Sequence, residues 1–129
     1  MCCYQQFFIQ MKTLKLTLNK EWFNLIERGI KTEEYREIKK YWVDRLCEKH
    51  PPSVIAGGDL SGRHDNMQYD IKKFDLVEFT NGYNKKSPQI TLEVSDITIG
   101  TGNLLWGAVG DTQYFIIKLG REVGRQNCC

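Results

Sequence analysis

The sequence predicts a small α+β domain in which a mixed, partly closed β-barrel carries two or more short helices. Three observations predict it: a strictly alternating segment near the start, two stretches with helical spacing before residue 50, and a second half of strand-like segments separated by glycine-containing turns. At 129 residues the chain has the length of one domain with one hydrophobic core.

The first elements are a strand and a helix. Residues 13–18 read Thr-Leu-Lys-Leu-Thr-Leu, so three leucines face one side of a strand and polar side chains face the other. Asn19 is a suitable N-cap for a helix over residues 20–28, and Gly29 suits the end of that helix.

A charged segment and a second helix follow. Residues 31–36 are too few for a helix of their own, and we interpret them as a turn that leads into a strand. Apolar side chains at helical spacing predict a helix over residues 39–48, which two prolines end. The polar, glycine-containing stretch that continues to residue 68 predicts a long surface loop.

The second half predicts three strands, over residues 74–80, 89–99 and 113–119. The turn at residues 82–88 makes the first two a hairpin candidate. Residues 100–111 hold four glycines and Trp106, which indicates a connection with one large anchor.

The ends of the chain lack such patterns. We expect residues 1–11 to be poorly ordered or appended, residues 12–121 to form the domain, and residues 122–129 to be a tail. Four of the five cysteines form adjacent pairs at the two ends, Cys2-Cys3 and Cys128-Cys129, which is no disulfide framework. With no apolar stretch long enough for a membrane span and no signal-peptide layout, we expect a cytoplasmic protein that does not engage a membrane.

The overall charge indicates no particular partner. Eighteen basic and sixteen acidic residues leave a net charge of +2, which is too small to indicate nucleic-acid binding by charge alone. Any basic binding surface must therefore be local.

The segment with the strongest chemical pattern is residues 29–36. On an extended strand Glu34 and Arg36 point to the same side, so a carboxylate and a guanidinium share one face. As a solvated ion pair they would contribute about 0 to 1 kcal/mol, whereas in a water-poor cleft the loss of one partner would cost roughly 3 to 5 kcal/mol. The pattern alone leaves both interpretations open.

The same segment carries a family resemblance. Gly29-x-Lys31-x-x-Glu34-x-Arg36 is similar to the G-x-K-x-x-E-x-R signature of ASCH domains, and it follows the first helix as theirs does. The opening leucine strand, both helices, the Phe79-x-Asn81-Gly82-Tyr83 hairpin and the closing strand also resemble that family's layout, over roughly residues 12–121.

The resemblance implies a PUA-like β-barrel that binds RNA or a nucleotide-like small molecule in a basic cleft beside residues 29–36. Arginine offers phosphate a flat, two-pronged contact and lysine a point charge, while nearby aromatic rings can stack on bases. The expected ligand-binding residues are Lys31, Glu34, Arg36, Tyr35, Arg45, Asn81, Tyr83 and Trp106.

The resemblance also implies enzymatic alternatives. In the family's bacterial N4-acetylcytidine amidohydrolases, a lysine and a threonine of the signature act with a glutamate from a later strand. Lys31 matches the lysine, Glu34 stands in place of the threonine, and Glu93 is the candidate for the later glutamate. A ribonuclease that uses the same charged groups is the second enzymatic alternative. A protein-interaction module without chemistry is a separate, non-enzymatic alternative.

We expect no cofactor and no metal. Cys47-x-x-His50 gives only half of a zinc motif, because no second Cys or His pair follows it. His64, Asp59 and Asp65 in the predicted loop complete no known spacing.

Overall fold

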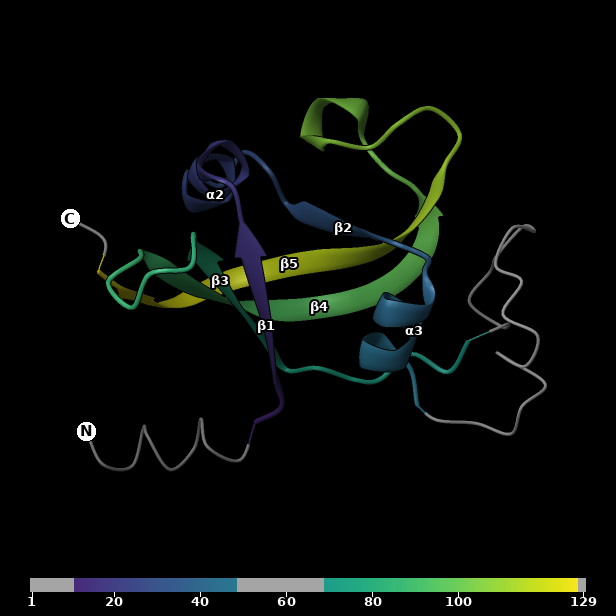
Figure 1. Ribbon diagram of the computed structural model, residues 1–129, viewed down its shortest axis with the longest axis horizontal. Helices are drawn as coiled ribbons and strands as arrows, with labels where there is room; N and C mark the ends of the chain where they lie inside the picture. The colour runs from purple at the N-terminus through teal and green to yellow at the C-terminus, as the bar shows by residue number, and fades with distance from the viewer. Residues whose placement is uncertain (1–10, 49–68, 128–129) are drawn as a thin grey trace. The chain divides into compact units, whose positions relative to one another are not determined.

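The part of the chain that the structure describes is a mixed α+β arrangement of five strands and two short α-helices (Figure 1). The computed structural model describes residues 11–48 and 69–127. In chain order the elements are β1 (Thr13–Leu18), α2 (Lys20–Glu27), β2 (Glu33–Glu37), α3 (Lys40–Leu46), β3 (Leu76–Asn81), β4 (Gln89–Thr101), the 3-10 helix η1 (Leu104–Trp106) and β5 (Gln113–Gln126). No helix among these residues is both long and apolar enough to cross a membrane.

Every helix and strand that the sequence predicts within the described residues is present; β1 has the predicted bounds, and the other elements differ at one or both ends. The second helix is shorter than expected, since α3 covers only residues 40–46. The last strand is longer, since β5 continues to Gln126 and includes residues 122–126 of the expected tail. The predicted loop up to residue 68 lies outside the described residues.

The strands pair in the order β1-β3-β4-β5-β2. β1 runs parallel to β3, while β3 with β4 and β2 with β5 are antiparallel, so the predicted mixed sheet is confirmed. Among the described residues no ladder joins β1 to β2, and the sheet is therefore not closed into a barrel.

The chain divides into two compact units. The first comprises Met1–Thr32, Lys73–Ser95 and Leu119–Cys129, and the second comprises Glu33–Lys72 and Asp96–Lys118. β4 and β5 contribute residues to both.

In the first unit, the leucine face of β1 packs inward as its alternation predicts: Leu14, Leu16 and Leu18 are all buried. The N-cap prediction is also confirmed, because the side chain of Asn19 accepts a hydrogen bond of 3.0 Å from the backbone N–H of Trp22.

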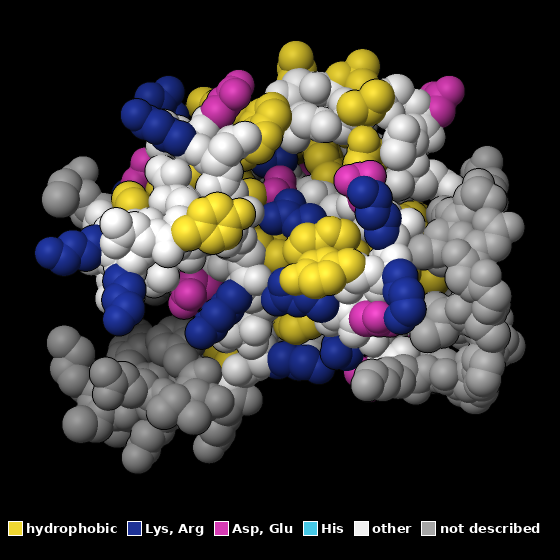
Figure 2. Space-filling view, viewed as in Figure 1, with side chains coloured by type: hydrophobic (Ala, Val, Ile, Leu, Met, Phe, Trp, Pro, Cys, Tyr) yellow, Lys and Arg dark blue, Asp and Glu magenta, His cyan; other side chains and the backbone are white. Residues whose placement is uncertain are grey.

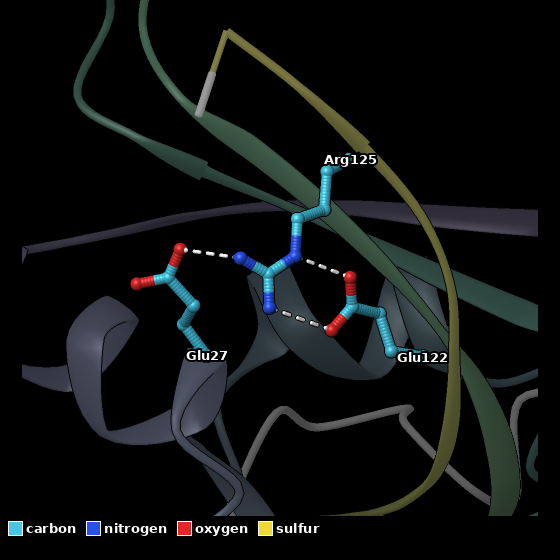
Figure 3. Close-up of polar contacts among 3 residues, drawn as sticks. All are labelled: Glu27, Glu122 and Arg125. Atoms are coloured by element: carbon cyan, nitrogen blue, oxygen red, sulfur yellow. Dashed lines mark hydrogen bonds and ion pairs between the residues drawn. The ribbon is translucent and has the colours of Figure 1, made fainter. Parts of the chain in front are cut away.

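The last turn of α2 is joined to the end of β5 by an arginine (Figure 3). Arg125 Nη1 lies 3.0 Å from Glu27 Oε2, and Arg125 Nη2 lies 3.0 Å from Glu122 Oε1. The hydrogen bonds from Arg125 lower the pKa of Glu122. This arginine helps to hold residues 122–126 in β5 although they lack an apolar pattern.

In the second unit, a small core forms beneath the connection between β4 and β5. It contains Tyr35, Ala108, Tyr114 and Ile116, with Trp106 packed against it. The β2–β5 ladder fixes its register by pairing Tyr35 with Ile116. The predicted anchoring role of Trp106 in residues 100–111 agrees with this packing.

Candidate ligand-binding site

The centre of the candidate site is a carboxylate–guanidinium pair on β2, in the second unit. Arg36 Nη1 donates hydrogen bonds to the Glu34 carboxylate and to the backbone carbonyl of Tyr35, the latter at 2.9 Å. The side chains of Arg36 and Glu34 are only 14% and 6% exposed. The predicted shared face is therefore confirmed, and the pair is far more buried than an ordinary surface ion pair.

The guanidinium of this pair lies beside an aromatic ring of α3. Arg36 Cζ is 5.1 Å from the centroid of the Trp42 ring, and Arg45 Cζ is 5.3 Å from the same centroid. Cation–π contacts of this kind contribute about 0.5 to 1 kcal/mol when exposed and about 2 kcal/mol when desolvated. Two cations thus share one indole ring.

Tyr41 extends this arrangement toward solvent. Its ring lies edge-on to Trp42, with centroids 4.8 Å apart and an interplanar angle of 89°. Arg45 Cζ lies 5.8 Å from the Tyr41 centroid, and Arg45 Nη1 donates a hydrogen bond of 3.3 Å to the Tyr41 hydroxyl. We call Arg36, Tyr41, Trp42 and Arg45 the arginine–aromatic group.

The helix explains why these side chains meet. Val43 and Leu46 are the buried residues of α3, so they supply its contacts with the core. Residues four apart are neighbours on a helix surface, which brings Tyr41 and Arg45 together. Figure 2 shows Lys and Arg side chains bordering hydrophobic ones near the middle of the visible face.

Tyr35, between the two charged residues, points to the other side of β2. Its hydroxyl donates a hydrogen bond of 2.8 Å to Glu33 and accepts one of 2.8 Å from the backbone N–H of Asn103. Burial of the side chain raises the pKa of Tyr35 to about 12. The Tyr35 ring lies in the small core, and its hydroxyl binds the backbone just before η1. Tyr35 is therefore not part of the proposed binding surface.

Lys31 belongs to the first unit. Its side chain is 1% exposed, and its Nζ lies 5.2 Å from the centroid of the Trp22 ring. Lysine is almost never fully buried without a partner. All buried side-chain nitrogen and oxygen atoms of the described residues have a hydrogen-bond partner, so the Lys31 ammonium is satisfied.

The other predicted site residues are divided between the units. Glu93, Asn81 and Tyr83 lie in the first. The Glu93 carboxylate is 3.7 Å from Arg121 Nε, Asn81 donates its backbone N–H to a carbonyl in the hairpin turn, and Tyr83 is 94% exposed in that turn. Trp106 lies in the second unit, half-buried against the Tyr35 core.

The described residues contain no group of three or more His, Cys, Asp or Glu side chains that could hold a metal ion. Cys47 is buried, and burial raises its pKa to about 11, which disfavours the reactive thiolate. Its predicted companions His50, His64, Asp59 and Asp65 lie outside the described residues.

The expected ligand-binding set includes Arg45, whereas the sequence indicates Tyr41 and Trp42 only as aromatic rings able to stack on a base. The four-residue spacing of Tyr41 and Arg45 signals their contact. The contact between Arg36 and Trp42 has no comparable signal, because it depends on how α3 packs after β2.

Comparison with known proteins finds no matching family model, no matching curated protein and no matching solved structure. The resemblance to ASCH domains stays a prediction from the sequence.

Proposed function

We propose that this protein is a PUA-like domain of the ASCH kind that binds RNA or a nucleotide-like ligand at the arginine–aromatic group, beside residues 29–36. The observation that carries the proposal is the placement of Arg36, which is held by Glu34 and lies over the Trp42 ring. An arginine fixed in this way presents its planar fork in one orientation, which suits a phosphate or a base carbonyl.

The charges of the group favour an anionic ligand. It brings two guanidinium groups together with one carboxylate, that of Glu34. Lys39 and Lys40 nearby on the chain are each paired with an acidic side chain, Glu37 at 3.2 Å and Asp44 at 2.8 Å. The two arginines at the Trp42 ring are therefore the cations that the proposal assigns to the ligand.

The geometry supports binding better than hydrolysis. A carboxylate that acts as a general base must reach the proton it abstracts. Glu34 instead accepts a hydrogen bond from Arg36, and Glu93 lies by Arg121. Lys31 is 1% exposed beside the Trp22 ring, so a ligand in solvent has little access to its amine.

Fluorescence anisotropy with labelled short RNAs, and competition with free nucleotides, tests the proposal. Arg36→Lys keeps the charge but loses the planar fork, so we expect weaker binding of every ligand that the native protein binds. Arg121→Lys, at a side chain 79% exposed in the first unit, is the matched control and should bind as the native protein does. Equal affinity of native protein and Arg36→Lys would contradict the proposal.

A further inference from the structure

We propose that Tyr41 and Arg45 form an outer subsite, where one unpaired base of a single-stranded nucleic acid stacks on the tyrosine ring and the adjacent phosphate contacts the guanidinium. This inference rests on the proposed function and names its ligand more closely: a strand longer than one nucleotide. It follows from the exposure of Tyr41, its contacts with neighbours on α3, and the Trp42 ring that Arg45 and Arg36 both contact.

The first step is the exposure of Tyr41. The side chain is 60% exposed, whereas Val43 and Leu46 of the same helix are buried. Tyr41 therefore contributes little to folding, and much of its ring surface is open to a ligand. An exposed aromatic ring stacks well on any nucleobase, because every base has a π-face.

The second step is the arginine beside the ring. The Arg45 guanidinium is oriented by the Tyr41 hydroxyl and by the rings of Tyr41 and Trp42. A base that stacks on Tyr41 would bring its own phosphate next to this guanidinium. Base stacking and a phosphate contact at adjacent positions are the combination that single-strand binding sites use.

The third step is continuity with the inner site. Arg36 Cζ and Arg45 Cζ lie 5.1 Å and 5.3 Å from the same Trp42 centroid, so the two guanidinium groups are no more than about 10.4 Å apart. One nucleotide at Arg36 would leave the outer subsite empty, whereas a strand would engage both arginines through successive phosphates. A duplex would engage them poorly, since its bases are stacked on one another and cannot splay onto the tyrosine.

The test compares Tyr41→Leu, which removes the aromatic face, with Tyr41→Phe, which keeps the face and loses only the hydroxyl. Leu105→Ala is the control, since it also changes an apolar side chain, 80% exposed, in the second unit. The probes are fluorescein-labelled hexamers of uridylate and adenylate as RNA and DNA, a blunt RNA duplex, and the mononucleotides UMP and AMP. Circular dichroism of each variant verifies folding.

We expect Tyr41→Leu to weaken hexamer binding by about 5- to 150-fold, which corresponds to roughly 1 to 3 kcal/mol for one stacked base. Tyr41→Phe should stay within about threefold of the native protein, because it retains the stacking face. Mononucleotide affinity should fall by clearly less than hexamer affinity in Tyr41→Leu, because one nucleotide held at Arg36 gains less from the outer ring. Ultraviolet cross-linking of the uridylate hexamer, followed by mass spectrometry, should place the cross-link on Tyr41.

Three results would overturn the subsite: native-like hexamer binding by Tyr41→Leu, an equal loss of mononucleotide binding, or a duplex that binds as tightly as the single strands. Each leaves the proposed function standing if the native protein still binds nucleotides through Arg36. Binding of neither hexamers nor mononucleotides by the native protein would refute the proposed function itself.

Discussion

The buried pair on β2 makes a prediction about stability that does not depend on any ligand. Replacing Arg36 by leucine keeps an apolar stem but leaves the Glu34 carboxylate, whose side chain is 6% exposed, without its guanidinium. Removing one partner of a buried ion pair costs about 3 to 5 kcal/mol, because the remaining charge stays desolvated. The stacking on Trp42 is lost as well. We therefore expect Arg36→Leu to lower the free energy of unfolding by about 3 to 5 kcal/mol.

Urea unfolding at neutral pH, followed by circular dichroism, measures this value for a double-mutant cycle. The cycle consists of Arg36→Leu, Glu34→Leu and the double variant. The double variant removes both charges of this pair, so it should be more stable than Arg36→Leu alone, with a coupling energy on the order of 1 to 3 kcal/mol. Arg121→Leu is the control: its partner Glu93 is 46% exposed, and an exposed pair contributes about 0 to 1 kcal/mol.

Two outcomes would refute the reasoning. If Arg36→Leu costs no more than Arg121→Leu, the pair is not desolvated as its burial indicates. If the effects of the two single substitutions simply add in the double variant, Glu34 and Arg36 are energetically independent despite their hydrogen bond.

Two further predictions concern the small core of the second unit. Gly102→Ala would place a Cβ 2.7 Å from Tyr35 Cζ and 2.8 Å from Ala108 Cβ, so we expect urea unfolding to show a loss of roughly 1 to 3 kcal/mol in the free energy of unfolding. Gly124→Ala is the control, because its Cβ would meet no atom within 4 Å, and it should be neutral or slightly stabilising. Equal effects of the two substitutions would contradict this prediction. The pKa of Tyr35 is raised from 10.0 to about 12 on folding. The stabilisation that this shift gives to the folded state is therefore complete below pH 10 and is lost as the pH rises from 10 to 12. Native protein should therefore lose stability more steeply than Tyr35→Phe over that range, and parallel curves would disprove the shift.

The elements that the sequence predicted well are those whose pattern is local. The period of two in β1 and the cap of α2 at Asn19 need no information from the rest of the chain, and both are confirmed. The end of β5 was missed for the opposite reason. Its residues after Leu119 are mostly glycines and charged side chains, with Val123 as the one apolar side chain and no alternation. Their strand conformation depends on partners distant in sequence, such as Glu93 beside Gly120 and Glu27 beside Arg125.

The same difference between local patterns and long-range contacts explains which parts of the candidate site could be predicted from the sequence. The shared face of Glu34 and Arg36 follows from strand geometry, but the ring over which Arg36 lies comes from the packing of α3, which no spacing encodes. The signature also looks like one continuous motif in the sequence, yet its members are held by different local contacts. The backbone N–H of Lys31 bonds to the carbonyl of Leu25 in α2, whereas Glu34 and Arg36 are held by the ladder with β5. Alternation therefore applies to the two residues within β2 and not to Lys31, whose side chain is placed by the end of the preceding helix.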